Sequence, residues 1–239
     1  MTELKIDPKQ VAVVLLWIVM VLSFLNGLLL GLQFYLGESA LDTLVDFFDL
    51  DLEGNIPSLY SAVTTLACSG WLALIARVNW NRSGGQRYHW LGLSVIFVYL
   101  GIDEGVAIHE KLSNFMEQYM AAKGFLYFLW VVPYGIATAV LGLVYFKFWW
   151  GLPKLTRARF MVAGLLFVGG AVGLDMVGGY LAERYGTHSV LYTLEYSIEE
   201  LLEMLGILLF NYALLTYLAE ETGGVVLRLS PPDRDKGNS

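Results

Sequence analysis

The chain has 239 residues, of which 56% are hydrophobic and only 15% are charged, with a mean hydropathy of +0.58. A soluble domain carries about 25% charged residues, so the composition excludes an ordinary cytoplasmic globule, and an aromatic fraction of 14% excludes an intrinsically disordered chain. The net charge of −7 argues against nucleic-acid binding, which needs a basic surface. Cys68 is the only cysteine, which excludes an intramolecular disulfide and a cysteine-based metal site.

Six apolar stretches are long enough to cross the hydrocarbon core of a bilayer, which needs roughly 20 residues of helix. They are, in chain order, approximately Val11–Tyr35, Pro57–Ala76, Trp90–Ala107, Phe125–Phe146, Phe160–Leu181 and Val190–Leu218. The first stretch is too long for a cleavable signal peptide, and no small-residue cleavage site follows it. The sequence therefore predicts an all-α, polytopic membrane bundle with six transmembrane helices within residues 1–220.

The basic residues are divided unequally between the loops that six spans would create. With both termini on the same side, 12 of the 15 lysines and arginines lie on that side, and only Lys111, Lys123 and Arg184 lie on the other. Loops that are rich in lysine and arginine stay in the cytoplasm. We therefore expect both termini to be cytoplasmic and the protein to be integral to the plasma or inner membrane.

Two segments fall outside the predicted spans. Residues 38–53 carry six acidic residues and no basic ones, and their apolar residues recur at helical spacing. This pattern is typical of a short amphipathic helix, here expected on the outer surface of the membrane. Residues 221–239 combine glycine, proline and mixed charge, and we expect them to form a disordered cytoplasmic tail.

Ionisable residues lie inside three of the predicted spans, although such residues are rare in membrane helices and usually mark a functional site. They are Asp103, Glu104, His109 and Glu110 in the third span, Asp175 in the fifth, and Glu195, Glu199, Glu200 and Glu203 in the sixth. A helix rises about 1.5 Å per residue, which places the acids of all three spans in the outer half of the membrane. The predicted topology therefore brings them to one depth.

The directions in which these residues face are less uniform than their depth. Glu195, Glu199 and Glu203 fall within about 80° of one helix face, whereas one straight helix cannot aim all the ionisable residues of the third span at one point. Gly169 and Gly173 form a small-xxx-small pair that permits close contact between the fifth span and its neighbours. So many carboxylates cannot all be ionised in a low dielectric, so either a cation lies among them or some of them are protonated.

The first hypothesis is an outward-facing, intramembrane site for a divalent cation. Carboxylates with an imidazole suit Mg, Ca, Mn or Fe, and such a metal activates water in hydrolases, here on a membrane-borne or periplasmic small substrate. The expected metal ligands are Asp103, His109, Glu110, Asp175, Glu199 and Glu203. The expected catalytic residues are Asp103, Glu104 and Glu200. We expect neither haem nor nucleotide, because candidate axial ligands are few and no phosphate-binding loop is present.

Two other hypotheses stay open. The acids are also the usual relay groups of a proton- or cation-coupled transporter or channel, although no acidic step in the inner half of the membrane completes a path. Alternatively the protein is structural, with acids near the span ends that reach the water of the lipid headgroups. Asn26 and Asn211 are expected to form hydrogen bonds between helices, and Tyr134 and Tyr192 to be packing or interfacial aromatic residues.

Overall fold

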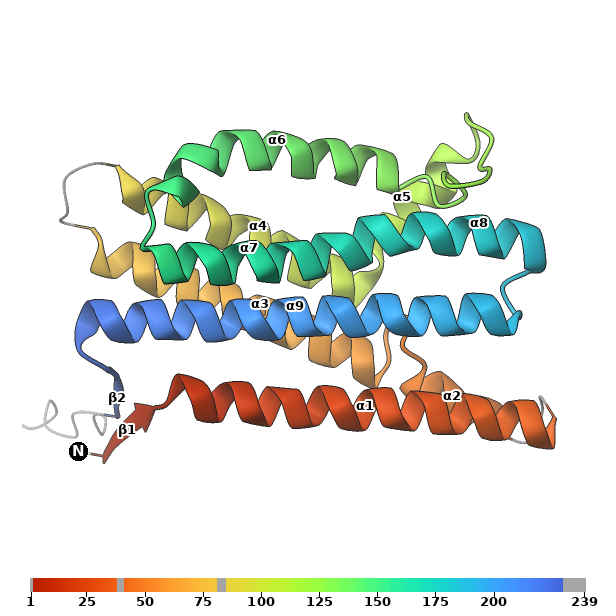
Figure 1. Cartoon of the computed structure of the whole chain (residues 1–239), viewed down its shortest axis with the longest axis horizontal. Helices are drawn as coiled ribbons and strands as arrows, with labels where there is room; N and C mark the ends of the chain where they lie inside the picture. The colour runs from red at the N-terminus through yellow and green to blue at the C-terminus, as the bar shows by residue number, and fades with distance from the viewer. Residues whose placement is uncertain (1, 38–40, 81–84, 230–239) are drawn as a thin grey trace, which may run out of the picture.

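The structure is a computed structural model that describes residues 2–37, 41–80 and 85–229. Its helices are α1 (Pro8–Leu36), α2 (Asp42–Phe48), α3 (Ile56–Val78), α4 (Gln86–Val106), α5 (Ile108–Met116), α6 (Val131–Trp150), α7 (Lys154–Val168), the π-helix η2 (Gly169–Leu174), α8 (Asp175–Tyr185) and α9 (Val190–Thr222). The segments α7, η2 and α8 follow one another without a break and form one continuous helical rod (Figure 1).

Among the described residues, five helical segments are long and apolar enough to cross a membrane, and the bent pair α4–α5 would make a sixth crossing. These segments correspond to the six predicted spans, which confirms the helical architecture and the presence of helices long and apolar enough to cross a membrane. The helix of the fourth predicted span, α6, begins at Val131 rather than at Phe125, because residues 123–130 fold into consecutive turns. The third span differs most from the prediction, because it bends by 74° between α4 and α5.

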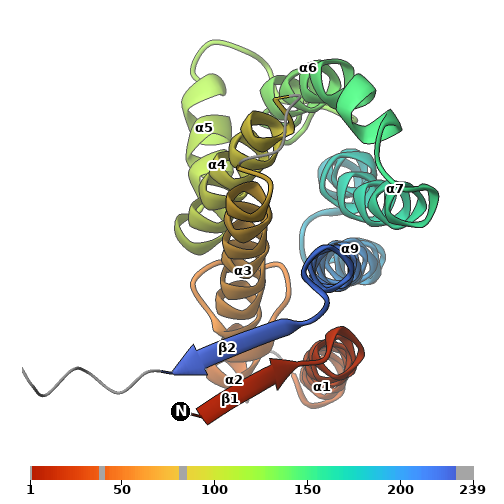
Figure 2. The same ribbon diagram turned by 90° about the vertical axis from the view of Figure 1, so that its left-hand side faces the viewer.

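Helix α9 is the axis of the bundle. It lies against α1 and α3 on one side and against α7, η2 and α8 on the other. Figure 2 shows α1, α9 and α7 stacked in one column, with α3 and α4 beside it and α6 at the top. The expected polar contacts are present: Asn26 Nδ2 donates to Ser197 Oγ (3.1 Å), and Asn211 Nδ2 donates to the carbonyl oxygen of Thr64 (3.1 Å). These bonds join α9 to α1 and to α3.

Glycines allow the α7–α8 rod to approach α9 closely. A Cβ at Gly206 would lie 2.7 Å from a backbone nitrogen and 3.0 Å from a carbonyl oxygen of α7. A Cβ at Gly170 would lie 2.9 Å from the carbonyl oxygen of Glu199. The prediction that Gly169 and Gly173 make this contact is wrong, because no atom of the described residues lies within 4 Å of a Cβ at either position.

The two segments outside the predicted spans are more ordered than the sequence indicates. Within residues 41–53, α2 covers only Asp42–Phe48, and the chain then turns into the bundle, where the Leu50 amide donates to Asn26 Oδ1 (3.3 Å). Residues 38–40 lie outside the described residues. At the other end, β2 (Val225–Leu229) pairs antiparallel with β1 (Thr2–Ile6), so the expected disorder does not include residues 221–229. Residues 230–239 lie outside the description.

The contact at Gly206 can be tested by substitution. Gly206→Ala is expected to lower the free energy of unfolding by about 1–3 kcal/mol, because the new methyl group meets backbone atoms that move only if α7 and α9 separate. Gly164→Ala is the matched control on α7, since no described atom lies within 4 Å of its Cβ. Unfolding of the purified protein in mixed detergent micelles measures both variants. Equal losses of stability would contradict the close contact.

Candidate functional site

One cavity of about 1280 Å³ lies between α4, α6, α7 and α9 and reaches the loop that joins α2 to α3. Its lining includes all the predicted catalytic and metal-binding residues, His109 among them. The carboxyl side chains that line it are Asp51, Glu53, Asp103, Glu104, Glu110, Glu117, Asp175, Glu199, Glu200 and Glu203. Within the described parts of the chain, no lysine or arginine lines the cavity. We refer to the part that these carboxyl groups line as the acidic end of the cavity.

A backbone break shapes the acidic end. Ala107, between α4 and α5, has φ 53° and ψ 52°, and it is the one non-glycine residue with positive φ in the described chain. The left-handed conformation is unfavourable for a residue with a Cβ, by about 1–2 kcal/mol. Such strain is found where the surrounding structure enforces it, often at functional sites. The break turns α5 back, so His109 faces the end of α4.

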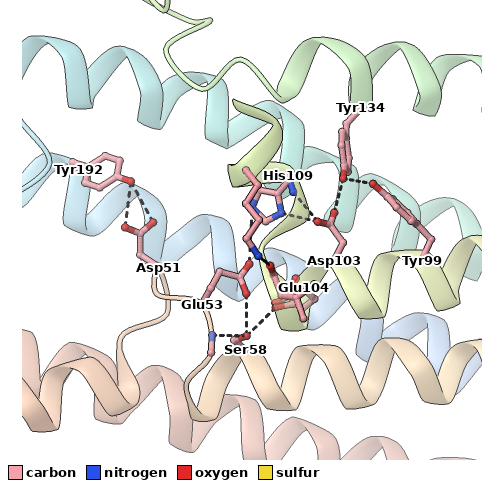
Figure 3. A network of polar contacts seen from close by, with 12 residues as sticks. Asp51, Glu53, Ser58, Tyr99, Asp103, Glu104, His109, Tyr134 and Tyr192 are labelled. Carbon is pink, nitrogen blue, oxygen red and sulfur yellow. Dashed lines mark hydrogen bonds and ion pairs between the residues drawn. The ribbon is translucent and has the colours of Figure 1, made fainter. Parts of the chain in front are cut away.

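Asp103 holds His109 in place. Asp103 Oδ1 accepts a hydrogen bond from the His109 backbone amide (2.8 Å) and lies 3.3 Å from Nδ1 of the His109 ring. Its other oxygen, Oδ2, accepts from the hydroxyl of Tyr134 (2.8 Å), which lies 2.5 Å from the hydroxyl of Tyr99. Figure 3 shows this chain of contacts running from His109 through Asp103 to α6. Both oxygens of Asp103 are therefore engaged by groups of the protein.

The loop between α2 and α3 completes this side of the site. Glu53 Oε1 lies 3.9 Å from Nε2 of His109, the ring nitrogen that faces away from Asp103. Glu53 Oε2 accepts from the hydroxyl of Ser58 (3.1 Å), which also lies 2.9 Å from the carbonyl oxygen of Glu104. Ser58 thus ties the loop to α4, and the imidazole lies between two carboxylates (Figure 3).

A second group of acids lies toward α8 and α9. The hydroxyl of Tyr192 donates to Asp51, at 3.2 Å from Oδ1 and 3.3 Å from Oδ2. Asp175 follows the π-helix directly, and its Oδ2 is buried with no hydrogen-bond donor among the described residues. The interactions of Glu199 with Asp175 and Glu203 are repulsive, since all three side chains are acidic. This group therefore contains carboxyl groups that the protein itself does not neutralise.

The acids of the α2–α3 loop titrate far from their usual range. Burial and the nearby charge of Asp49 together raise the pKa of Asp51 to about 7, against a hydrogen bond from Tyr192 that lowers it. Burial also raises the pKa of Glu53 to about 7, with His109 acting in the opposite direction. Asp51 stays accessible to solvent through the cavity, but protein atoms surround it on most sides. Both carboxyl groups therefore change charge near neutral pH.

The predicted residues share a cavity without forming a complete metal centre. Among the residues that the structure describes, no three His, Cys, Asp or Glu side chains are grouped in a way that could hold a metal ion. His109, Asp103 and Glu104 meet Glu53 near the break after α4. The remaining predicted residues are Glu110 on α5, Asp175 on α8, and Glu199, Glu200 and Glu203 on α9. Glu104 and Glu203 interact electrostatically, which links the two groups across the cavity.

Comparison with known protein families identifies the family to which the chain belongs. Residues 11–218 match the family described as "Domain of unknown function (DUF8692)". The chain belongs to this family. The match includes α3 to α8 and most of α1 and α9, and with them the whole lining of the cavity. No curated protein and no solved structure matches the chain.

Several site residues escape the sequence analysis. Glu53 and Asp51 fall in the segment expected on the outer surface, but the chain turns inward after α2 and brings them to the cavity. The sequence indicates only a packing or interfacial role for Tyr134 and Tyr192, yet their hydroxyls donate to Asp103 and Asp51. The one available signal was the run of acids in residues 38–53 with no basic partner.

The strain at Ala107 leads to a test. Ala107→Gly is expected to leave the free energy of unfolding unchanged or to raise it by up to about 1 kcal/mol, because glycine adopts positive φ without a steric penalty. Ala107→Val is expected to lower it by more than about 1 kcal/mol, because a β-branched side chain fits this conformation poorly. Unfolding in detergent measures both variants. A straight α4–α5 helix would give the opposite order.

The raised pKa values of Asp51 and Glu53 lead to a second test. Both groups hold their protons to about pH 7 in the folded chain but have lower pKa values when unfolded, so the folded state binds more protons in between. Their contribution to the free energy of unfolding therefore falls as the pH rises from about 4 to about 7. Infrared titration should show protonated carboxyl groups that disappear near pH 7, with a smaller signal in Asp51→Asn and in Glu53→Gln. An unchanged signal in both variants would contradict the assignment.

Proposed function

We propose that this membrane protein binds a divalent cation at the acidic end of the cavity and uses it to activate water for hydrolysis of a membrane-borne substrate. The single observation that carries the proposal is the orientation of His109, which presents one ring nitrogen to Asp103 and the other to Glu53. Metal-binding histidines commonly donate their second ring N–H to a carboxylate, which fixes the ring and the tautomer. Asp103 has this supporting position.

The distances around His109 suit a bound ion. His109 Nε2 and Glu53 Oε1 lie 3.9 Å apart, and an ion bound to both at about 2.0–2.3 Å fits between them at an open angle. Further ligands would come from Glu104 and Glu110, whose flexible side chains also line the cavity. In this arrangement Asp103 would orient the imidazole, and Glu200 would accept a proton from a water molecule that the bound cation activates.

The charge of the cavity supports the same proposal. Carboxylates inside a low dielectric repel one another unless a cation or protons neutralise them, and the described lining offers only His109 as a basic group. A divalent ion would neutralise two carboxylates at once. The hard oxygen donors favour Mg, Ca, Mn or Fe.

The proposal includes an orientation, with both termini in the cytoplasm and the acidic end facing outward. It is supported by the excess of lysine and arginine, 12 of 15, in the segments that flank the cytoplasmic ends of the spans. The starts of α1, α4 and α7 and the ends of α3, α6 and α9 lie at one end of the bundle (Figure 1).

Cation- or proton-coupled transport is the second candidate function. The observation that favours it is the group formed by Asp175, Glu199 and Glu203, where acids repel one another and Asp175 Oδ2 has no donor among the described residues. Acidic side chains of this kind relay protons or bind ions in membrane transporters. Transport would need no stoichiometric metal, which separates it from the first candidate.

Elemental analysis of the detergent-purified protein, prepared without a polyhistidine tag, tests the metal site. The wild-type protein is expected to carry about one divalent ion per chain, and His109→Gln and Glu53→Gln to lose it, because each removes a ligand. Asp103→Asn is expected to weaken metal affinity by about 10–100-fold, since the ring loses its orienting carboxylate.

The matched control is His188→Gln, because His188 is exposed in the turn before α9 and does not line the cavity. It is expected to retain the wild-type metal content. A metal-free wild-type protein with carboxyl groups that titrate near neutrality would contradict the metal proposal and favour transport. Equal metal content in His109→Gln and in the control would contradict the assignment of His109.

A further inference from the structure

The cavity has a second end whose chemistry differs from that of the acidic end. Beyond Tyr134 on α6, its described lining carries no ionisable Asp, Glu, His, Lys or Arg side chain. Aliphatic and aromatic residues line it, and the aromatic residues include Phe146, Phe148 and Trp149 from α6 and Phe160 from α7. We refer to this part as the apolar end. A cavity with a charged end and a hydrocarbon-like end fits an amphiphile rather than a polar solute.

The cavity is also elongated. On α6 its lining extends from Tyr134 beside Asp103 to Phe148, and 14 residues of helix rise by about 21 Å. Gly142 and Gly164 line the middle of this path, and no described atom lies within 4 Å of a Cβ at either glycine. The path therefore has the length and width for a single hydrocarbon chain, with its head near Asp103.

The electrostatics of the acidic end select the head. No lysine or arginine in the described lining could pair with a phosphate or carboxylate head. Asp175 is 9% exposed, and its Oδ2 reaches no donor among the described residues, although the residue lines the cavity. Glu199 is also 9% exposed and has acidic neighbours. A buried carboxylate without a donor requires a positively charged or hydrogen-bond-donating partner.

We infer that the cavity binds a single-chain amphiphile with a primary amine head, the ammonium group lying against Asp175 and Glu199 and the chain extending to the apolar end. An ammonium group has three donors and a positive charge, which match the unsatisfied Oδ2 of Asp175 and the acidic side chain of Glu199. This inference rests on the proposed function in so far as the amphiphile is the substrate or product of that site. Its binding group consists of other residues than His109 and Glu53, although His109 lies near enough to Asp175 to interact with it electrostatically.

Binding can be measured with bromine-labelled hexadecylamine and the full chain in lipid nanodiscs, with a chelator present throughout. Trp130 and Trp149 line the cavity, so bromine bound there quenches their fluorescence in a saturable manner. The amine is expected to bind about tenfold or more tightly than labelled hexadecanol, and labelled hexadecanoate to bind more weakly than both. Equal saturable binding of all three compounds would overturn the inference.

Two sets of variants assign the two ends. Asp175→Asn and Glu199→Gln are each expected to weaken amine binding by about tenfold or more while leaving binding of hexadecanol unchanged. Gly142→Phe is expected to weaken binding of hexadecylamine by about tenfold or more but to leave octylamine unaffected, because the new ring fills the path of the chain. Gly31→Phe on α1 is the control, since Gly31 also has open space around it and does not line the cavity.

The outcomes separate this inference from the proposed function. Amine selectivity that persists in a protein without stoichiometric metal would support the inference and contradict the metal site. A protein with metal but with no preference for the amine, or with the same affinity in Asp175→Asn and Glu199→Gln as in wild type, would contradict the inference and leave the metal proposal intact. If Gly142→Phe does not discriminate chain length, the chain does not occupy the apolar end.

Discussion

The rest of the structure depends on one electrostatic constraint: carboxyl groups gathered inside an apolar bundle must be neutralised or hydrogen-bonded. The described lining of the cavity offers a single imidazole and no lysine or arginine for ten carboxyl side chains. Uncharged donors supply part of the need, namely the hydroxyls of Tyr134 and Tyr192 and the backbone amide of His109. That amide is available to Asp103 because it lies in the first turn of α5, and the first amides of a helix have no hydrogen-bond partner within the helix. The break after α4 therefore serves the electrostatics of the site.

The same constraint explains why α9 and the α7–α8 rod pack so closely. Helix α9 carries glutamates on the face that meets this rod, so the opposing surface must leave room for them. Gly170 and Gly178 provide that room, since a Cβ at Gly170 would collide with the side chain of Glu203 and a Cβ at Gly178 with the side chain of Glu195. The π-helix, which contains Gly170, adds a wider turn just before Asp175. π-helical turns of this kind are frequent at functional sites in helical proteins.

Hydropathy was sufficient to predict the helical spans, and the depth of the acids followed from helical rise. All of the predicted site residues consequently line one cavity. The local backbone could not be predicted in the same way. Nothing in the sequence around Ala107 identifies it as a left-handed residue, because alanine is among the best helix formers. Likewise, the inward turn that places Glu53 depends on tertiary contacts such as Leu50 with Asn26, and periodicity reports only on regular elements.

The pairing of β1 with β2 has a consequence for how the chain is assembled. Residues 2–6 precede all the described helices, and their partners, residues 225–229, follow the last of them. This pair therefore cannot form until all the described helices have been synthesised. Contacts between such distant segments form late because closing a long loop costs entropy. The strand pair thus joins the segments that flank the helical bundle, and it does so only after α9 has been synthesised.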